Sequence, residues 1–413
     1  MRATKDSGFE WIGIIPAEWG LSKIGQVYRL RNTKVSDTDY PPLSVTNKGI
    51  VPQLDTAAKT NAHDDRKLVK KGDFAINSRS DRRGSCGISD YDGSVSLINT
   101  ILAPLNEMNP GYYDWLFHTV QFGDEFYKFG HGIVDDLWTT GWQEMKKITI
   151  PTPPLPEQQR IADFLDAKCA EIDALTADIQ TQIDTLEQYK RAVITETVTK
   201  GLNPNAEMKD SGIQWIGNMP AHWDVIRGKY ILRYMQKPVR EDDGVITCFR
   251  DGEVTLRSNR REDGFTMSDK EIGYQGIDVG DLVVHGMDGF AGSIGISDSR
   301  GKASPVLNVL DTDQCKRYIM YYLRSMAYSD VFLALATGIR VRSCDLRWNK
   351  LAELSYPVPP LDEQNAIVKH IDSVLSKADA VIADKKAQLA TLDEYKKSLI
   401  FEYVTGKKEV PAS

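Results

Sequence analysis

The chain lacks the features of secreted and membrane-spanning proteins. No apolar stretch approaches the ~20 residues that cross a bilayer, and the N-terminus has no signal-peptide core. Cysteine is sparse, odd in number and never arranged as C-x-x-C, which is typical of reduced structural thiols. These absences predict a cytoplasmic protein without disulfides, whose five cysteines are Cys86, Cys169, Cys248, Cys315 and Cys344.

Motifs for nucleotide and metal chemistry are also missing. There is no G-x-x-x-x-G-K-[ST] loop, and the six histidines are dispersed with no pair at metal-ligand spacing. Gly289, Gly292 and Gly295 form G-x-x-G-x-x-G, but no helix pattern follows, so we interpret them as turns. The sequence therefore predicts no catalytic residue, metal or cofactor in this chain.

The charge argues against a general nucleic-acid binder, which carries a basic excess. The 413 residues have a net charge of −7 and 41% apolar content, and this length predicts two or three domains. Residues 151–203 hold 5 basic and 9 acidic residues, so more than half of the net negative charge lies in this segment. Local basic clusters then matter more than the total.

A long helix is the clearest single prediction. No Gly or Pro occurs between Glu157 and Lys200, and apolar residues recur every seven positions. Such a heptad repeat needs a partner helix along its apolar seam. The seam consists of Leu165, Ile172, Ile179, Leu186 and Val193, with Leu175 and Tyr189 expected on a second line.

The same chain supplies the partner. P-P-L-P-E-Q at Pro153 returns as P-P-L-D-E-Q at Pro359, and the later landmarks share the offset of 206. In the second copy Lys385 replaces Ile179, which makes it the weaker zipper. Two similar helices joined by a domain most simply pack antiparallel about a pseudo-two-fold axis. The apolar seam of this second helix consists of Ile371, Ala378, Leu392 and Leu399.

A short segment at the start of each half of the chain is repeated as well, and we call it the arm. K-D-S-G-F-E-W-I-G-I-I-P-A-E-W, with Trp11 and Trp19, matches K-D-S-G-I-Q-W-I-G-N-M-P-A-H-W, with Trp215 and Trp223. Indoles so placed could stack on bases or anchor a partner. We favour an arm whose indoles pack on the long helices.

The segments between arm and helix diverge but keep an α+β pattern. Strands are expected at Lys147–Ile150 and Asp281–Val284, and aromatic helices at Tyr112–Val120 and Tyr318–Met326. The predicted fold class is α+β, with two pseudo-repeated mixed domains separated by two long helices that form an antiparallel coiled coil. We expect domains at 1–152 and 204–358, and the helices, the second with its tail, at 153–203 and 359–413.

Three basic clusters in Gly- and Ser-containing loops are candidates for DNA binding. Arginine forks suit bidentate contact with guanine or phosphate, and Ser and Asn read other base edges. Adjacent acids (Asp81, Glu262 and Asp345) leave a salt-bridged surface open as an alternative for each cluster. The candidates are Arg79, Ser80, Arg82 and Arg83; Arg257, Asn259, Arg260 and Arg261; and Arg340, Arg342 and Arg347.

This arrangement resembles the specificity subunit of type I restriction–modification systems over the whole chain. The resemblance rests on the two W-I-G-x-x-P-x-x-W arms, the P-P-L-x-E-Q helix starts at Pro154 and Pro360, and the Y-K helix ends at Tyr189 and Tyr395. It implies two target-recognition domains that each read one half of a split double-stranded DNA sequence, with the helices as spacer. Two methyltransferase subunits would bring S-adenosylmethionine, and restriction subunits would bring ATP, Mg and cleavage.

Two other function classes stay open from the residues. Asp136 with Glu144 and Lys146 has the outline of a D…E-x-K nuclease site, which would make the chain a self-contained metal-dependent DNA nuclease. A coiled-coil adaptor without DNA specificity is the other. Metal-dependent cleavage by the chain alone would favour the first, and absence of sequence-specific DNA affinity would favour the second.

Overall fold

The chain divides into two compact units. The first unit combines residues 1–179 with 386–413, and the second contains residues 180–385. Among the described residues no helix has both the length and the hydropathy to span a bilayer. The computed structural model describes residues 2–54, 63–79, 84–132, 138–260, 272–335 and 346–411.

The first unit carries the N-terminal domain. Its main sheet is antiparallel with strand order β10-β9-β12-β4, beside a three-stranded sheet β11-β8-β5 and the pairs β1-β2, β3-β13 and β6-β7. Its elements before the long helices are β1 (Thr4–Asp6), β2 (Ile14–Pro16), β3 (Gly20–Lys23), α1 (Ile24–Val27), β4 (Tyr28–Leu30), β5 (Lys34–Val35), β6 (Leu43–Thr46), β7 (Gly49–Pro52), β8 (Arg66–Val69), β9 (Phe74–Asn77), β10 (Cys86–Ile88), β11 (Gly93–Ser96), β12 (Asn99–Pro104), α2 (Pro110–Phe117), α3 (Val120–Lys128), α4 (Trp142–Met145) and β13 (Thr149–Thr152).

The second unit repeats this plan. Its main sheet has the order β22-β21-β24-β17, which matches the first sheet strand for strand, and the pairs β14-β15, β16-β25, β18-β19 and β20-β23 surround it. Its elements are β14 (Met208–Asp210), β15 (Asn218–Pro220), β16 (Asp224–Arg227), α6 (Gly228–Ile231), β17 (Leu232–Met235), β18 (Ile246–Cys248), β19 (Val254–Leu256), η3 (Arg257–Asn259), β20 (Gln275–Ile277), β21 (Leu282–His285), η4 (Gly289–Ala291), β22 (Ile294–Ile296), β23 (Gly301–Ala303), β24 (Leu307–Thr312), α7 (Lys316–Tyr328), α8 (Val331–Ala334), α9 (Trp348–Leu351) and β25 (Ser355–Val358).

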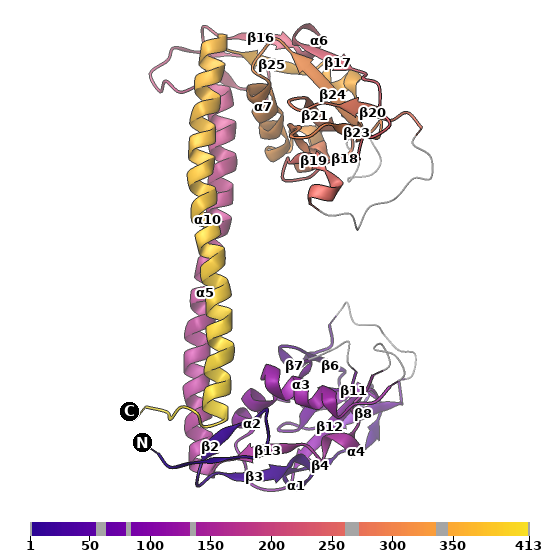
Figure 1. The fold of residues 1–413 in the computed structure, drawn as a ribbon, viewed down its shortest axis with the longest axis vertical. Helices are drawn as coiled ribbons and strands as arrows, with labels where there is room; N and C mark the ends of the chain where they lie inside the picture. The colour runs from indigo at the N-terminus through magenta and orange to yellow at the C-terminus, as the bar shows by residue number, and fades with distance from the viewer. Residues whose placement is uncertain are drawn as a thin grey trace. The chain divides into compact units, whose positions relative to one another are not determined.

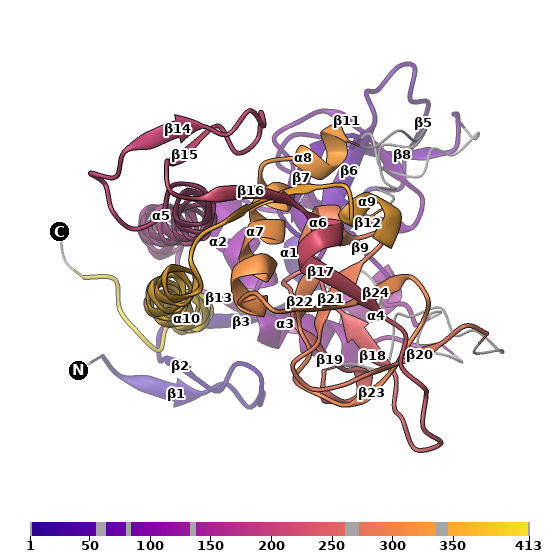
Figure 2. The same cartoon turned by 90° about the horizontal axis from the view of Figure 1, so that it is seen from above.

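The long helices are α5 (Leu155–Lys200) and α10 (Leu361–Val404), and each unit contains part of both. The two segments in each unit lie side by side and run antiparallel (Figures 1 and 2). Lys396 pairs with Asp173 at 2.5 Å in the first unit, and Lys190 pairs with Asp379 at 2.6 Å in the second. The predicted fold class, two mixed domains with an antiparallel helix pair, is confirmed.

The first predicted line of the α5 seam is confirmed, but the prediction of the second line was wrong. Leu165, Ile172 and Ile179 are buried, whereas Leu175 and Tyr189 are 47% and 52% exposed. The second line instead runs on the other side of the first. Apart from Ile183 its members are small or polar, which disguised it in the sequence. The line consists of Ala162, Cys169, Thr176, Ile183, Lys190 and Thr197.

The repeated E-Q motif ties each domain to the start of a long helix. Gln158 accepts a hydrogen bond from the backbone N–H of Asn109, next to α2, and donates to the carbonyl of Pro153. Gln364 does the same with Cys315, next to α7, and Pro359. Each glutamine therefore satisfies backbone groups at two helix starts at once.

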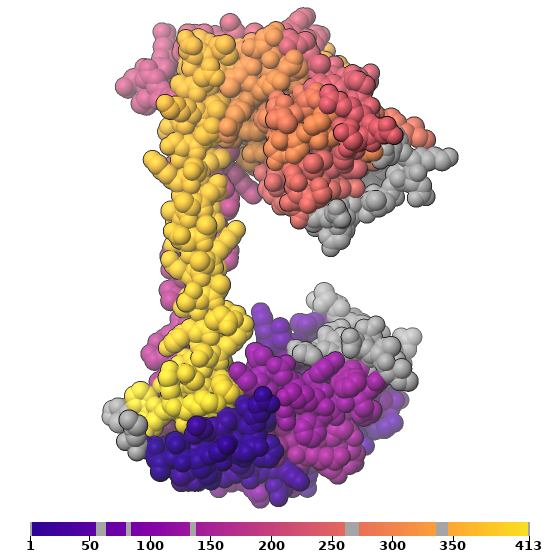
Figure 3. All heavy atoms as spheres, in the orientation of Figure 1, coloured from indigo at the N-terminus to yellow at the C-terminus, as the bar shows by residue number. Residues whose placement is uncertain are grey.

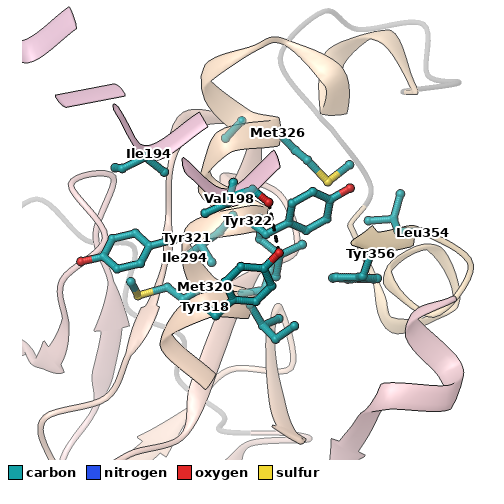
Figure 4. Packing of buried hydrophobic residues seen from close by; sticks show 14 of the residues in the cluster. Ile194, Val198, Ile294, Tyr318, Met320, Tyr321, Tyr322, Met326, Leu354 and Tyr356 are labelled. Carbon is teal, nitrogen blue, oxygen red and sulfur yellow. Dashed lines mark hydrogen bonds between the residues drawn. The ribbon is translucent and has the colours of Figure 1, made fainter. Parts of the chain in front are cut away.

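An aromatic helix ties each domain to the end of the other long helix. The hydroxyl of Tyr112 donates to the carbonyl of Val404 at 2.8 Å, and that of Tyr318 donates to Val198 at 3.1 Å (Figure 4). Burial raises the pKa of Tyr318 well above its usual value, so the hydroxyl stays protonated. Every unit is thus anchored to both helices.

The arms pack on the long helices, as the sequence analysis favoured. Figure 3 shows the N-terminal arm against the last turns of α10 in the first unit. A Cβ at Gly406 would lie 2.9 Å from the ring of Trp19, and one at Gly201 would lie 3.1 Å from Trp223. Both indoles are fully buried. Glycine is needed at both helix ends because each has a positive φ.

Candidate nucleic-acid interface

Five of the eleven predicted DNA-binding residues lie in the described part of the chain. Arg79 is exposed just after β9, and Arg347 is exposed as the N-cap of α9. Arg257, Asn259 and Arg260 lie together on and after η3. The remaining candidates, Ser80, Arg82, Arg83, Arg261, Arg340 and Arg342, lie outside the described residues, as does Asp136.

In the second unit β18, the turn that follows it and residues on either side of η4 line a cleft of about 550 Å³. Two predicted residues, Arg257 and Arg260, line it together with Arg250 from the hairpin turn, which sequence reasoning missed. The remaining polar lining consists of Thr247, Asp251, His285, Asp288, Ser293 and Ser304. We call this hollow the hairpin cleft.

Two arginines of the hairpin cleft, Arg250 and Arg260, are held in place by carboxylates. Arg260 pairs with Asp251 at 2.7 Å and Glu253 at 2.9 Å, and it stacks 4.2 Å over the ring of Phe249. Burial raises the pKa of Asp251, but the hydrogen bond and charge of Arg260 together with backbone N–H donors outweigh burial, and the pKa is lowered overall. Arg250 pairs with Asp288 at 3.2 Å. These contacts orient the guanidinium groups before any ligand arrives.

His285 is a neutral hydrogen-bond donor at the edge of the hairpin cleft. Burial lowers its pKa, which keeps the ring uncharged at neutral pH. Its Nδ1 accepts from the backbone N–H groups of Met287 and Asp288 at 3.2 and 3.0 Å. The remaining proton therefore lies on Nε2.

The G-x-x-G-x-x-G motif forms the platform for the hairpin. A Cβ at Gly295 would lie 2.0 Å from the carbonyl oxygen of Gly252, and one at Gly292 would lie 2.8 Å from that of Arg250. Gly292 has φ of 96° and ends η4, as a turn glycine does, but Gly295 lies in β22, so its interpretation as a turn was wrong. The motif lets two backbones touch and fixes where Arg250 stands.

The first unit has an equivalent hairpin, β6-β7. A Cβ at Gly87 in β10 would lie 2.7 Å from the Cα of Gly49 at the hairpin turn. The turn exposes Asn47 and Lys48, which the sequence analysis also missed. An Asn-Lys-Gly sequence between β-branched residues is a hairpin signal that could have identified them.

A second hollow, of about 260 Å³, lies beside Arg79 in the first unit. Phe117, Phe122 and Trp138 make it mostly apolar. Its polar groups are used internally: Trp138 Nε1 donates to the carbonyl of Tyr127, and the Thr140 hydroxyl donates to that of Phe126. In the described part of the chain no three His, Cys, Asp or Glu side chains gather as metal ligands would.

Most of the first unit is similar to a known protein family. Residues 16–185 match the family model of the type I restriction modification DNA specificity domain. The chain is 26% identical to the MjaX specificity subunit of Methanocaldococcus jannaschii over 65% of the chain and 61% of that subunit. It is 24% identical to the MjaVIII specificity subunit of the same organism, over 77% and 76%. The chain thus spans about three fifths of the length of the MjaX relative.

Solved structures share the fold. A chain from a study of complex assembly and conformational transition of the type I restriction–modification system aligns with a TM-score of 0.70 at 15% identity, over 95% of this chain and 99% of that one. The HsdS subunit of Thermoanaerobacter tengcongensis aligns with a TM-score of 0.52 at 16% identity, over 98% and 100%. None of these relatives supports the nuclease or the adaptor alternative.

Proposed function

Because the chain belongs to the family of type I restriction–modification specificity subunits, we propose that it recognises a bipartite double-stranded DNA sequence. Each unit reads one half of the target, and partner subunits carry out adenine methylation and cleavage. The observation that carries the proposal is the repeat of one sheet order and one helix anchorage around divergent loops. A constant scaffold with variable loops is what two different half-sites require.

In this proposal the partner subunits, and not this chain, bind the cofactors. Methyltransferase subunits bring S-adenosylmethionine, restriction subunits bring ATP and Mg, and the chain itself brings base recognition. The domain limits 1–152 and 204–358 remain a prediction for the two readers. The proposed localisation is the cytoplasm, where the protein would meet its DNA target and its partner subunits.

Methylation mapping of the assembled methyltransferase tests this function. We expect one split recognition sequence, with Arg79→Ala relaxing one half and Arg257→Ala the other. A lost bidentate arginine–guanine contact costs about 1–3 kcal/mol, whereas a lost phosphate contact weakens all sequences alike. Relaxation of both halves by either variant would refute separate readers. A complex without any sequence preference would refute DNA recognition altogether.

The methyltransferase subunits need a docking surface, and the helix pair offers one in each unit. Leu175 and Tyr395 are 47% and 52% exposed in the first unit, and Val381 and Tyr189 are 43% and 52% exposed in the second. Leu175 and Tyr189 directly precede members of the second seam line of α5. Val381 and Tyr395 likewise precede Ile382 and Lys396, the α10 residues that stand 206 positions after Thr176 and Lys190. In an antiparallel pair these flanks border each other, so we call the four residues the tyrosine flank.

The tyrosine flank has the chemistry of a protein interface. Tyrosine is enriched in interface cores, and contiguous exposed apolar side chains mark interaction sites. The offset of 206 residues makes the two pairs equivalent, which suits two copies of one partner. We therefore assign one methyltransferase subunit to each pair.

Charged substitutions on the tyrosine flank should prevent assembly. Tyr395→Glu is expected to weaken binding of one methyltransferase subunit at least tenfold, and Tyr189→Glu with Tyr395→Glu that of both, because a buried unpaired carboxylate is costly. Lys386→Glu, at an exposed position on the opposite flank, is the matched control. Mass measurement of the complexes decides it. Full assembly of the double variant would show that the partners dock elsewhere.

A further inference from the structure

We propose that the hairpin cleft of the second unit reads a G·C base pair in the major groove, with Arg250 on the guanine and Asp288 holding the arginine fork. This inference rests on the proposed function and names the determinant in the second half of the target. Guanine offers N7 and O6 as acceptors on one edge, and arginine matches them with two parallel N–H groups.

Arg250 has the position that such a reader needs. Its side chain is 69% exposed at the hairpin turn, so it can reach a base edge. Its backbone is fixed, because its carbonyl oxygen lies against Gly292 and the following Gly252 lies against Gly295. The turn is closed by a hydrogen bond of 2.8 Å from Phe249 N–H to the carbonyl of Glu253. A fixed backbone reduces the entropy lost when the side chain binds.

Asp288 gives the fork its direction. Its Oδ1 accepts from one terminal nitrogen of Arg250 at 3.2 Å. Asp288 also lies 4.0 Å from Nε2 of His285, whose neutral ring adds a donor without adding charge. An arginine held by a carboxylate on one side presents its other edge in a fixed plane, which is the geometry for bidentate contact.

The charge of the hairpin cleft distinguishes a base edge from a phosphate. Three arginines line it, but Asp251 and Asp288 stand among them, and Glu253 pairs with Arg260 from outside. Carboxylates repel a phosphate, which binds best to a purely basic surface. A G·C pair presents acceptors on guanine and an amino donor on cytosine, so it suits a mixed lining.

The floor of the cleft has an unmet hydrogen-bonding group. Ser293 is 1% exposed and its hydroxyl has no hydrogen-bond partner among the described residues. Buried hydroxyls in proteins are nearly always bonded, and unpaired ones point to a missing partner. A polar group that enters the cleft, either from the base pair or from a water that it carries, would complete this bond.

The test uses the full chain in the assembled methyltransferase. Methylation mapping and DNA binding at two salt concentrations are compared for Arg250→Ala and Asp288→Asn. The controls are Arg227→Ala and Glu353→Gln, since this ion pair, 3.0 Å long and about half exposed, lies outside the cleft in the same unit. An unchanged first half-site, the half that Arg79→Ala alters, shows that each variant is folded and assembled.

We expect both cleft variants to relax one G·C position in the second half-site, with discrimination falling roughly 5- to 150-fold. The salt dependence should stay as in the parent, and the controls should change nothing. Equal weakening on all sequences with a flatter salt dependence, or tighter binding by Asp288→Asn, would overturn the proposal in favour of a phosphate site. No change in either variant would also overturn it. A parent complex without a split target would instead refute the function on which the inference rests.

Discussion

A four-residue helical insertion after Thr185 in α5 is expected to leave both half-site sequences intact and to lengthen the unread gap between them. Four residues add about 6 Å of helix, against 3.4 Å per base pair. The gap should therefore grow by one to about two base pairs. The insertion nearly preserves the apolar seam, as a stutter that locally unwinds the coil.

The antiparallel register refines this experiment. The ion pairs Asp173–Lys396 and Lys190–Asp379 place Thr185 opposite Asp384, so the peptide bond after Thr185 is level with the one after Ala383. A second variant with four further residues after Ala383 lengthens both helices at the same level. We expect it to give the larger gap, because no segment of either helix then lacks a partner. Methylation mapping of both variants gives the gap directly.

Thr185 also allows a strict control for helix continuity. It is exposed and its hydroxyl bonds to the carbonyl of Thr181 within the same helix. Thr185→Ala should behave as the parent, whereas Thr185→Pro should abolish recognition, because proline breaks a helix interior at a cost of about 3 kcal/mol or more. An insertion variant with the old gap and a changed half-site would refute a spacing role for the helices.

Replacement of either arm tryptophan is the second large effect that we expect. Trp19→Ala and Trp223→Ala should each lower the free energy of unfolding of its own unit by about 3–5 kcal/mol, because both side chains are fully buried against a helix end. Trp19 also contacts Tyr112 edge to face at 6.4 Å between ring centroids. Denaturant titration with a probe in each unit measures the loss.

Phenylalanine substitutions separate packing from hydrogen bonding at these sites. The indole N–H of Trp19 donates at 2.8 Å to Glu157, which Arg2 also binds at 2.6 Å. The indole N–H of Trp223 has no hydrogen-bond partner among the described residues. Trp19→Phe should thus cost about 1–3 kcal/mol more than Trp223→Phe, since it leaves a buried carboxylate short of a donor. Equal losses would mean that the bond contributes nothing beyond packing.

The sequence predicted the parts of the fold that follow from periodicity and repetition. The helix pair, the two mixed domains and the packing of the arms all rest on apolar side chains at fixed spacing. The second seam line of α5 escaped because Leu175 and Tyr189 are more hydrophobic than Cys169 and Thr176, which the packing selects. Hydrophobicity alone cannot tell which side of a seam faces the partner.

The expected helix over Tyr112–Val120 shows the same limit at shorter range. The structure ends α2 at Phe117 and starts α3 at Val120. Thr119 caps α3 by accepting from the N–H of Phe122, and its hydroxyl also donates to Leu116. A threonine between two aromatic segments can cap or continue a helix, and tertiary packing decides.

The candidate site depended on contacts between distant segments. Arg257 and Arg260 were identifiable as a basic cluster, but Arg250 stands alone in the sequence. It enters the same cleft because Gly292 and Gly295 allow the hairpin to lie against β22. The glycine motif itself was visible, yet its partners lie about forty residues earlier. Proximity across a sheet edge is not encoded in local spacing.

The way in which the chain is divided between the two units also sets the order in which they can fold during synthesis. The second unit is one continuous segment, residues 180–385, whereas the first needs residues 386–413 to cover its part of α5 and to accept the bond from Tyr112. On the ribosome, the second unit can therefore close while the first still exposes the apolar side of α5. That exposed seam is where a chaperone would bind a nascent chain, and where premature pairing between two chains would begin.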